Sequence, residues 1–188
     1  MNTWIGETQL ELIEGDIADQ DTDAVVTAAH WDLAGGQGTD GSIHFKAGPQ
    51  LLLECSTIGG CPMGDAVITR GYLLRACHVI HAVGPVYEEG SEEEAELLAC
   101  AYQSSLRVAV ENKLQSISFP SISTGAFCYP IQLAAPIALQ AIIDFLENKP
   151  HSLTLVRIVL YPREDKAAYS VYAAALRGLL LARSSTAA

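Results

Sequence analysis

The feature that most constrains the fold of this chain is a continuous apolar run, AVVTAA, within residues 23–29. A strand with one solvated face alternates apolar and polar residues, whereas an unbroken run is typical of a strand buried on both faces of a parallel or mixed sheet. Such a sheet needs helices on both faces to cover it. This segment therefore predicts a layered α/β fold.

Strand-like and helical segments alternate along the rest of the chain, which predicts an α/β/α sandwich with helices on both faces of a central sheet. Further strands are expected at residues 9–14, 65–69, 77–83, 116–119 and 153–160. Helices are expected at residues 42–55 with a break near Gly48 and Pro49, from Ser91 to about Asn112, at 133–146 and at 163–182. Ser91 and Glu94 have capping-box spacing, and Pro136 is expected in the first turn of its helix.

Size and composition agree with one globular domain. The chain has 188 residues, 49% hydrophobic and 18% charged, so we expect a single domain over residues 1–188 with the last few residues frayed. The longest apolar stretches, 134–143 and 179–182, are well short of the roughly 20 residues that cross a bilayer. The N-terminal segment MNTWIGETQLELIEGD lacks a basic region and a long apolar region, so we expect no secretory signal and a cytoplasmic location.

Charge and cysteine usage narrow the possible partners. Lys and Arg total 11 against 22 Asp and Glu, a net charge of −11, which is a poor match to DNA or RNA. The five cysteines form no CxxC pair and fit reduced thiols. Within CHVIHAV, strand alternation would place Cys77 and His81 on one face and His78 on the other, which argues against a metal site. No metal, cofactor or membrane contact is predicted.

Two glycine-containing loops are the candidates for chemistry. Residues 34–41 and 121–130 each follow a predicted strand and precede a predicted helix, and ligands of such folds bind at the carboxyl ends of the strands. Glycines let a ligand approach main-chain N–H groups closely, and a helix N-terminus favours an anion. Two such loops could hold a diphosphate without lysine. Neither matches the P-loop or the GxGxxG fingerprint, and either loop alone could be an ordinary turn.

Several motifs, taken in order, resemble a macrodomain of the MacroD-type branch. They are GDI at 15–17, DAVVTAAHWDLAGGQGTDGSIH at 23–44, AGPQLLLEC at 47–55, CPMGDAVITRGYLL at 61–74, VIHAVGPVY at 79–87 and FPSISTGAFCYP at 119–130. The resemblance covers nearly the whole chain. It implies a three-layer α/β/α fold with a mixed sheet and a cleft for ADP-ribose. It also implies removal of ADP-ribose from acidic side chains, or deacetylation of O-acetyl-ADP-ribose.

The resemblance also implies roles for individual residues. Asp16 would accept a hydrogen bond from the adenine amino group beside the N–H of Ile17, and Tyr161 would cover the adenine. The two loops would hold the diphosphate and distal ribose through Gly35, Gly36, Gly38 and Gly41 and through Ser123, Thr124, Gly125, Ala126 and Phe127, with Tyr129 supporting the second loop. Asp16 could instead cap a turn, and Tyr161 could be a packed residue at a strand end.

Asp40 matches the acidic residue of the family that positions or activates the attacking water. It could also be the N-cap of a helix starting at Ser42. His44, in the same motif, is interpreted as structural rather than catalytic.

Four positions depart from the family pattern. The usual NAAN is TAAH here, so Thr27 and His30 stand where asparagines that contact the ligand are expected. His30 could hydrogen-bond a ribose hydroxyl or act as a base near neutral pH, or it could be a non-catalytic histidine. Gln37 and Cys128 replace loop glycines, and either could narrow the cleft or force a different loop shape.

The sequence therefore leaves three hypotheses. The first is an ADP-ribosyl ester hydrolase with Asp40 and His30 as catalytic residues. The second is a module that binds ADP-ribose without turnover. In the third, the altered loops bind another nucleotide or a sugar phosphate.

Overall fold

A computed structural model describes residues 1–148, 150–162 and 167–186. Within these residues, seven strands form one mixed sheet in the order β1-β2-β7-β6-β3-β5-β4. The strands are β1 (Asn2–Ile5), β2 (Thr8–Glu14), β3 (Ala24–Ala28), β4 (Ala66–Arg70), β5 (His78–Ala82), β6 (Ser116–Phe119) and β7 (Leu155–Leu160). The inner strands β2, β7, β6, β3 and β5 run parallel, and β1 and β4 pair antiparallel at the two edges. The mixed sheet is therefore confirmed.

Strand β3 divides the core into two halves, as its unbroken apolar pattern predicts. Val26 belongs to the larger cluster of buried side chains, whereas its neighbour Val25 points to the smaller one. Both valines are almost fully buried. Successive side chains of a strand point to opposite faces, so a strand that is covered on both sides must be apolar throughout.

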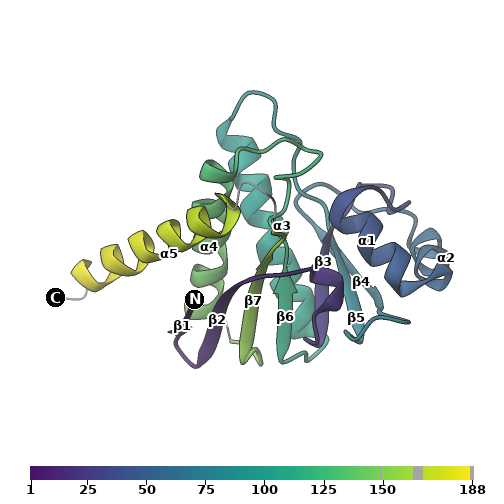
Figure 1. Cartoon of the computed structure of the whole chain (residues 1–188), viewed down its shortest axis with the longest axis horizontal. Coiled ribbons are helices and arrows are strands. Elements are labelled where there is room, and N and C mark those ends of the chain that lie inside the picture. Colours follow the sequence, from purple (N-terminus) through teal and green to yellow (C-terminus); the bar gives the residue numbers. More distant parts are fainter. Residues whose placement is uncertain (149, 163–166, 187–188) are drawn as a thin grey trace.

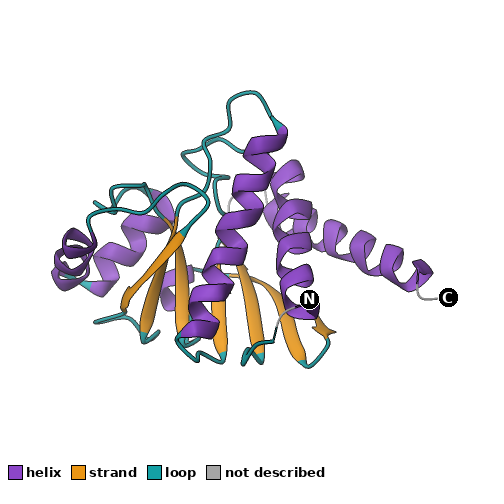
Figure 2. Cartoon of the chain, turned by 180° about the vertical axis from the view of Figure 1, so that it is seen from behind, coloured by secondary structure: helices purple, strands orange, loops and turns teal. Residues whose placement is uncertain are grey.

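The helices cover the two faces of the sheet. Helices α1 (Gly38–Ala47) and α2 (Pro49–Ile58) lie over the side of β3 and β5, whereas α3 (Glu92–Glu111) and α4 (Ile131–Asn148) cross the opposite face, as the two views show (Figures 1 and 2). Helix α5 (Ala167–Thr186) packs against α4 and then extends away from the sheet (Figure 1). A short 3-10 helix, η1 (Ile17–Asp19), follows β2. These layers confirm the α/β/α sandwich.

Local signals explain several element boundaries. Gly48 has φ +85°, a backbone conformation that other residues rarely adopt, and Pro49 opens α2, which accounts for the break between α1 and α2. At the start of α3, the Ser91 hydroxyl accepts the Glu94 N–H at 3.2 Å. The Glu94 carboxylate accepts the backbone N–H groups of Glu89 and Gly90, so it reaches back past the N-cap residue in a variant of the capping box.

Two expected boundaries are wrong. Helix α1 begins at Gly38 with Gln37 at its N-cap, so Asp40 lies inside the first turn and is not a cap for Ser42. A carboxylate is favoured anywhere in the first turn, so the sequence does not distinguish these positions. Helix α4 begins at Ile131, so Pro136 lies beyond the first turn. Gln132, whose carbonyl loses its usual N–H donor, is exposed and can bind water.

Other differences concern the ends of the chain. The short edge strand β1 was not expected from the sequence, and residues 163–166, the beginning of the last predicted helix, lie outside the described residues. In the described part of the chain, no helix combines the length and the apolar character needed to span a membrane.

Candidate functional site

A cleft of about 840 Å³ opens where the parallel strands end. Its walls come from the segments after β2, β3, β5, β6 and β7 and from the start of α1. The residues predicted to bind ligand that line it are Asp16, Ile17, Gly38, Ser123, Thr124, Gly125, Ala126, Phe127 and Tyr161. Thr27, His30, Gly35, Gly36, Asp40 and Gly41 are not among its lining residues within the described chain. The cleft volume suits a nucleotide-sized molecule.

At one end of the cleft, Asp16 is held as a charged acceptor. Its Oδ1 accepts the Ala18 N–H at 2.9 Å, and its Oδ2 accepts hydrogen bonds from Lys46 Nζ at 3.0 Å and Ser42 Oγ at 3.4 Å. Burial alone would raise the pKa of Asp16, but the Ala18 N–H and Lys46 together lower it below its ordinary value. The sequence reasoning did not identify Lys46, which also pairs with Asp19 at 2.8 Å.

The first of the two loops, residues 34–41, is called the glycine loop here, and it depends on close contacts that side chains would block. A Cβ atom on Gly41 would lie 2.5 Å from the backbone oxygen of Gly36, so the loop packs directly onto the first turn of α1. Gly35 and Gly38 have positive φ, and Gly35 rests on the ring of His44. Gln37, which stands where a glycine was expected, lines the cleft with Gly38.

The second loop, residues 121–130, is held in shape by hydrogen bonds within its own backbone. The Tyr129 N–H bonds the Ser123 carbonyl at 3.0 Å, and the Cys128 N–H bonds the Gly125 carbonyl at 3.0 Å. The Tyr129 ring is buried against Tyr87, with ring centroids 5.0 Å apart. Ser123 is buried in a positive-φ conformation, and its hydroxyl lacks a hydrogen-bond partner.

Gly84 is a further residue of the cleft that the sequence reasoning missed. A Cβ at this position would lie 2.3 Å from Ser123 Oγ, so the segment after β5 can approach the second loop only with glycine here. The VGP triplet at residues 83–85 was the available signal.

Asp40 lies beneath the glycine loop, behind the cleft wall. Its side chain accepts a hydrogen bond from Thr27 Oγ1 at 2.8 Å, and His44 Nε2 is 3.7 Å from the same carboxylate oxygen. The residue is only 4% exposed. Burial raises the pKa of Asp40, and the Thr27 hydrogen bond opposes that effect. Thr27, which stands at an asparagine position of the family, therefore contacts the carboxylate.

His30 lies at the end of the site near Phe127. Its Nδ1 is 2.9 Å from Asp32 Oδ1, and its ring centroid is 6.5 Å from that of Phe127. The side chain is about half exposed. The hydrogen bond from His30, followed by the Ala34 N–H, lowers the pKa of Asp32. At the far end, Tyr161 is 67% exposed at the rim, after β7.

The described lining residues include one carboxylate and no lysine or arginine. An anionic ligand would therefore be bound by main-chain N–H groups, hydroxyls and the N-terminus of α1. Of the three residues for which a metal site was argued against, Cys77 is exposed and His81 is fully buried, and the absence of a metal there stays a prediction.

Comparisons with known proteins give the same architecture. The family model for the Macro domain matches residues 26–138. A macro domain-containing protein from Caldanaerobacter subterraneus is 47% identical over 86% of this chain and 94% of that protein. The solved Oceanobacillus iheyensis macrodomain with ADP has a TM-score of 0.90 and 41% identity, covering 96% of both chains.

A Trypanosoma brucei macrodomain in complex with ADP-ribose has a TM-score of 0.79 and 40% identity, covering 87% of this chain and 67% of that one. The family model covers more than half of the chain, and the Caldanaerobacter relative is similar over most of its length. This chain therefore belongs to the macrodomain family.

Proposed function

We propose that this protein binds ADP-ribose in the cleft. The adenine would lie at Asp16 and Ile17 under Tyr161, and the diphosphate between the glycine loop and the second loop. The distal ribose would then lie beside Phe127. The observation that carries the proposal is a cleft of about 840 Å³ that is lined by Asp16, the start of α1 and the loop after β6. Structural neighbours solved with ADP and with ADP-ribose support the choice of ligand.

We further propose that the protein hydrolyses the ester between ADP-ribose and an aspartate or glutamate side chain, or the acetyl ester of ADP-ribose. Water would add to the ester carbonyl, the ribose hydroxyl would leave, and the carboxylic acid would be released. Asp40 would position or activate that water after a small opening of the glycine loop above it. Its raised pKa favours this role, because a general base works best when its pKa approaches the operating pH.

His30 would assist at the distal-ribose end. With Asp32 accepting the Nδ1–H, the Nε2 atom keeps a lone pair that can accept a ribose hydroxyl or a proton from water. This is the same chemistry that an Asp–His pair provides in other hydrolases, where the carboxylate fixes the tautomer.

Calorimetry with ADP-ribose, followed by release of ADP-ribose from a modified protein, tests both steps. Asp40→Ala should lower the release rate by about 10²-fold or more while retaining ligand binding. Asp144→Ala, on α4 and away from the cleft, is the matched control and should leave the rate unchanged. Release that does not depend on Asp40 would overturn the catalytic assignment. Absence of ADP-ribose binding would point to another nucleotide or a sugar phosphate.

A second candidate function, binding without turnover, is favoured by the burial of Asp40 behind the cleft wall. His30→Asn restores the residue that the family pattern expects and helps to separate the two. A higher rate in this variant would show that His30 is a handicap for a hydrolase, and a lower rate would show that it takes part. Binding with no release from either protein would establish the binding module.

A further inference from the structure

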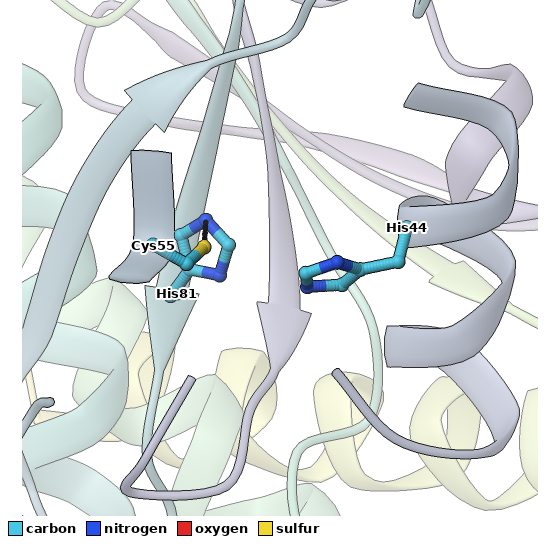
Figure 3. Close-up of side chains that lie close together, drawn as sticks. All are labelled: His44, Cys55 and His81. Carbon is cyan, nitrogen blue, oxygen red and sulfur yellow. Dashed lines mark hydrogen bonds between the residues drawn. The ribbon is translucent and has the colours of Figure 1, made fainter. Parts of the chain in front are cut away.

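Three potential metal ligands from separate elements meet below the glycine loop. His44 comes from α1, Cys55 from α2 and His81 from β5 (Figure 3). One donor atom from each residue lies within 4.8 Å of the other two. Figure 3 shows the His44 side chain reaching from α1 toward the other two, with a dashed line between the Cys55 sulfur and a nitrogen of the His81 ring. This His44–Cys55–His81 cluster is not part of the cleft wall.

The cluster contains two buried ring nitrogens that form no hydrogen bond. His81 Nδ1 and His44 Nε2 are both without a partner, although His81 is fully buried. His81 Nε2 lies 2.9 Å from the Thr69 hydroxyl and 3.7 Å from Cys55 Sγ. Binding of a metal through Nδ1 would leave Nε2 held by the Thr69 hydroxyl, as is common for the second nitrogen of a ligating histidine. Leaving such atoms unpaired in the core costs free energy, so a ligand for them is expected.

Charge and donor type indicate which ion would fit. Cys55 is a free thiol, and both Cys55 and His81 are almost fully buried. A thiolate at Cys55 together with the Asp40 carboxylate, 3.7 Å from His44 Nε2, would balance a divalent charge. Mixed sulfur and imidazole donors are typical of zinc sites.

We propose that the His44–Cys55–His81 cluster binds a thiophilic divalent cation of the zinc type. Zinc–sulfur bonds of about 2.3 Å and zinc–nitrogen bonds of about 2.0–2.1 Å give donor separations near 3.5 Å, so the three donors would move together by about 1 Å. Asp40 or a water molecule would complete the coordination. The Cys55 proton is released to solvent on binding, and no redox step is involved.

The ion would link α1 to α2 and β5. Because a Cβ on Gly35 would lie 3.4 Å from the His44 ring, the glycine loop rests directly on one ligand of the cluster. Fixing His44 would therefore stiffen the support of the loop and of Asp40, four residues before it on the same helix.

Titration of the reduced, chelator-treated full chain with Co²⁺ tests the proposal. The wild type should bind one equivalent and show a thiolate-to-cobalt charge-transfer band, and Zn²⁺ should displace the cobalt and raise the melting temperature. Cys55→Ser should lose the band and bind at least about tenfold more weakly. Cys61→Ser is the matched control, since Cys61 is also buried but lies outside the cluster.

A wild type without the band, or a Cys55→Ser variant that keeps it, would overturn the proposal. Circular dichroism shows whether Cys55→Ser folds. If it does not, His44→Gln provides the second variant, because that side chain is partly accessible and its loss should weaken Co²⁺ binding to a similar extent. Calorimetry with ADP-ribose on the same samples separates the two proposals. Ligand binding without Co²⁺ binding rejects only the metal site, and the reverse result rejects only the proposed function.

Discussion

Asp40 carries a carboxylate in a place that disfavours its charge. It is nearly fully buried, its hydroxyl partner is Thr27, and its pKa is raised above the ordinary value of 3.8. Stability lost at such a residue is commonly the cost of a functional group that must remain reactive. The same burial that destabilises the fold prepares the carboxylate to accept a proton.

Asp40→Asn should therefore make the protein more stable at neutral pH. A protein that contains a carboxyl with a raised pKa in the folded state loses stability as the pH rises through that pKa. The asparagine amide has no charge to bury and avoids this loss. We expect a gain of roughly 1 kcal/mol, or about 2–4 °C in melting temperature. Thermal unfolding measured from acidic to neutral pH checks this. The melting temperatures of the two proteins should converge well below pH 3.8, where the carboxyl is protonated in both the folded and the unfolded state. An equal difference at every pH would show that the effect is not electrostatic.

Asp16 and Asp19 offer a matched pair for the adenine end of the cleft. Both accept a hydrogen bond from Lys46, but only Asp16 lines the cleft. Asp16→Ala should weaken ADP-ribose binding by about tenfold or more, since a hydrogen bond to a charged group contributes roughly 1.5–3 kcal/mol. Asp19→Ala should change the affinity much less. Calorimetric titrations that gave equal losses would instead assign the effect to Lys46.

At the scale of elements, the two loops impose different requirements on their glycines. Gly41 is packed against backbone, whereas a Cβ on Gly125 would meet no protein atom within 4 Å. Gly125 lines the cleft, and Gly41 supports it from within α1. Substitutions at these two glycines can therefore separate an effect on protein stability from an effect on ligand binding.

Gly125→Ala should leave the melting temperature nearly unchanged and weaken ADP-ribose binding by about tenfold or more, because its methyl group would occupy ligand space. Gly41→Ala should destabilise the protein by about 1–3 kcal/mol, because its methyl group would overlap the Gly36 carbonyl. Thermal unfolding and calorimetry on both variants give the comparison. Full binding by Gly125→Ala would place the diphosphate elsewhere.

At the scale of the whole molecule, an acidic protein is proposed to hold an anionic ligand. The net charge is −11, and the described cleft residues include no lysine or arginine. Main-chain donors act at short range, whereas the net negative charge of the protein creates a long-range potential that repels an anionic ligand. Salt screens such long-range repulsion more than it weakens direct hydrogen bonds.

ADP-ribose affinity should therefore stay constant or rise slightly with salt. Calorimetric titrations between about 50 mM and about 500 mM KCl cover the range in which the screening length falls well below the protein's dimensions. A steep decrease in affinity with salt would mean that cationic side chains carry the binding, contrary to the backbone mechanism.

Much of the fold was predictable because its signals are local. The apolar run of β3, the Gly48–Pro49 break and the cap at Ser91 each act through residues close together in the sequence. Strand β1 was missed because four residues, of which only Ile5 is buried, are too short to show a pattern, and its pairing with β2 forms only after the chain turns back. The two loops were placed at one edge because parallel strands bring their carboxyl ends together.

The pattern of apolar residues and glycines was enough to predict the layered α/β class and the two loops that end at the cleft. The packed fold was needed to show that Thr27 contacts Asp40, that Lys46 holds Asp16, and that His44, Cys55 and His81 meet in the core. Propensity and periodicity act over a few residues. Contacts between distant residues depend on how whole helices and strands pack, and sequence patterns do not specify that geometry.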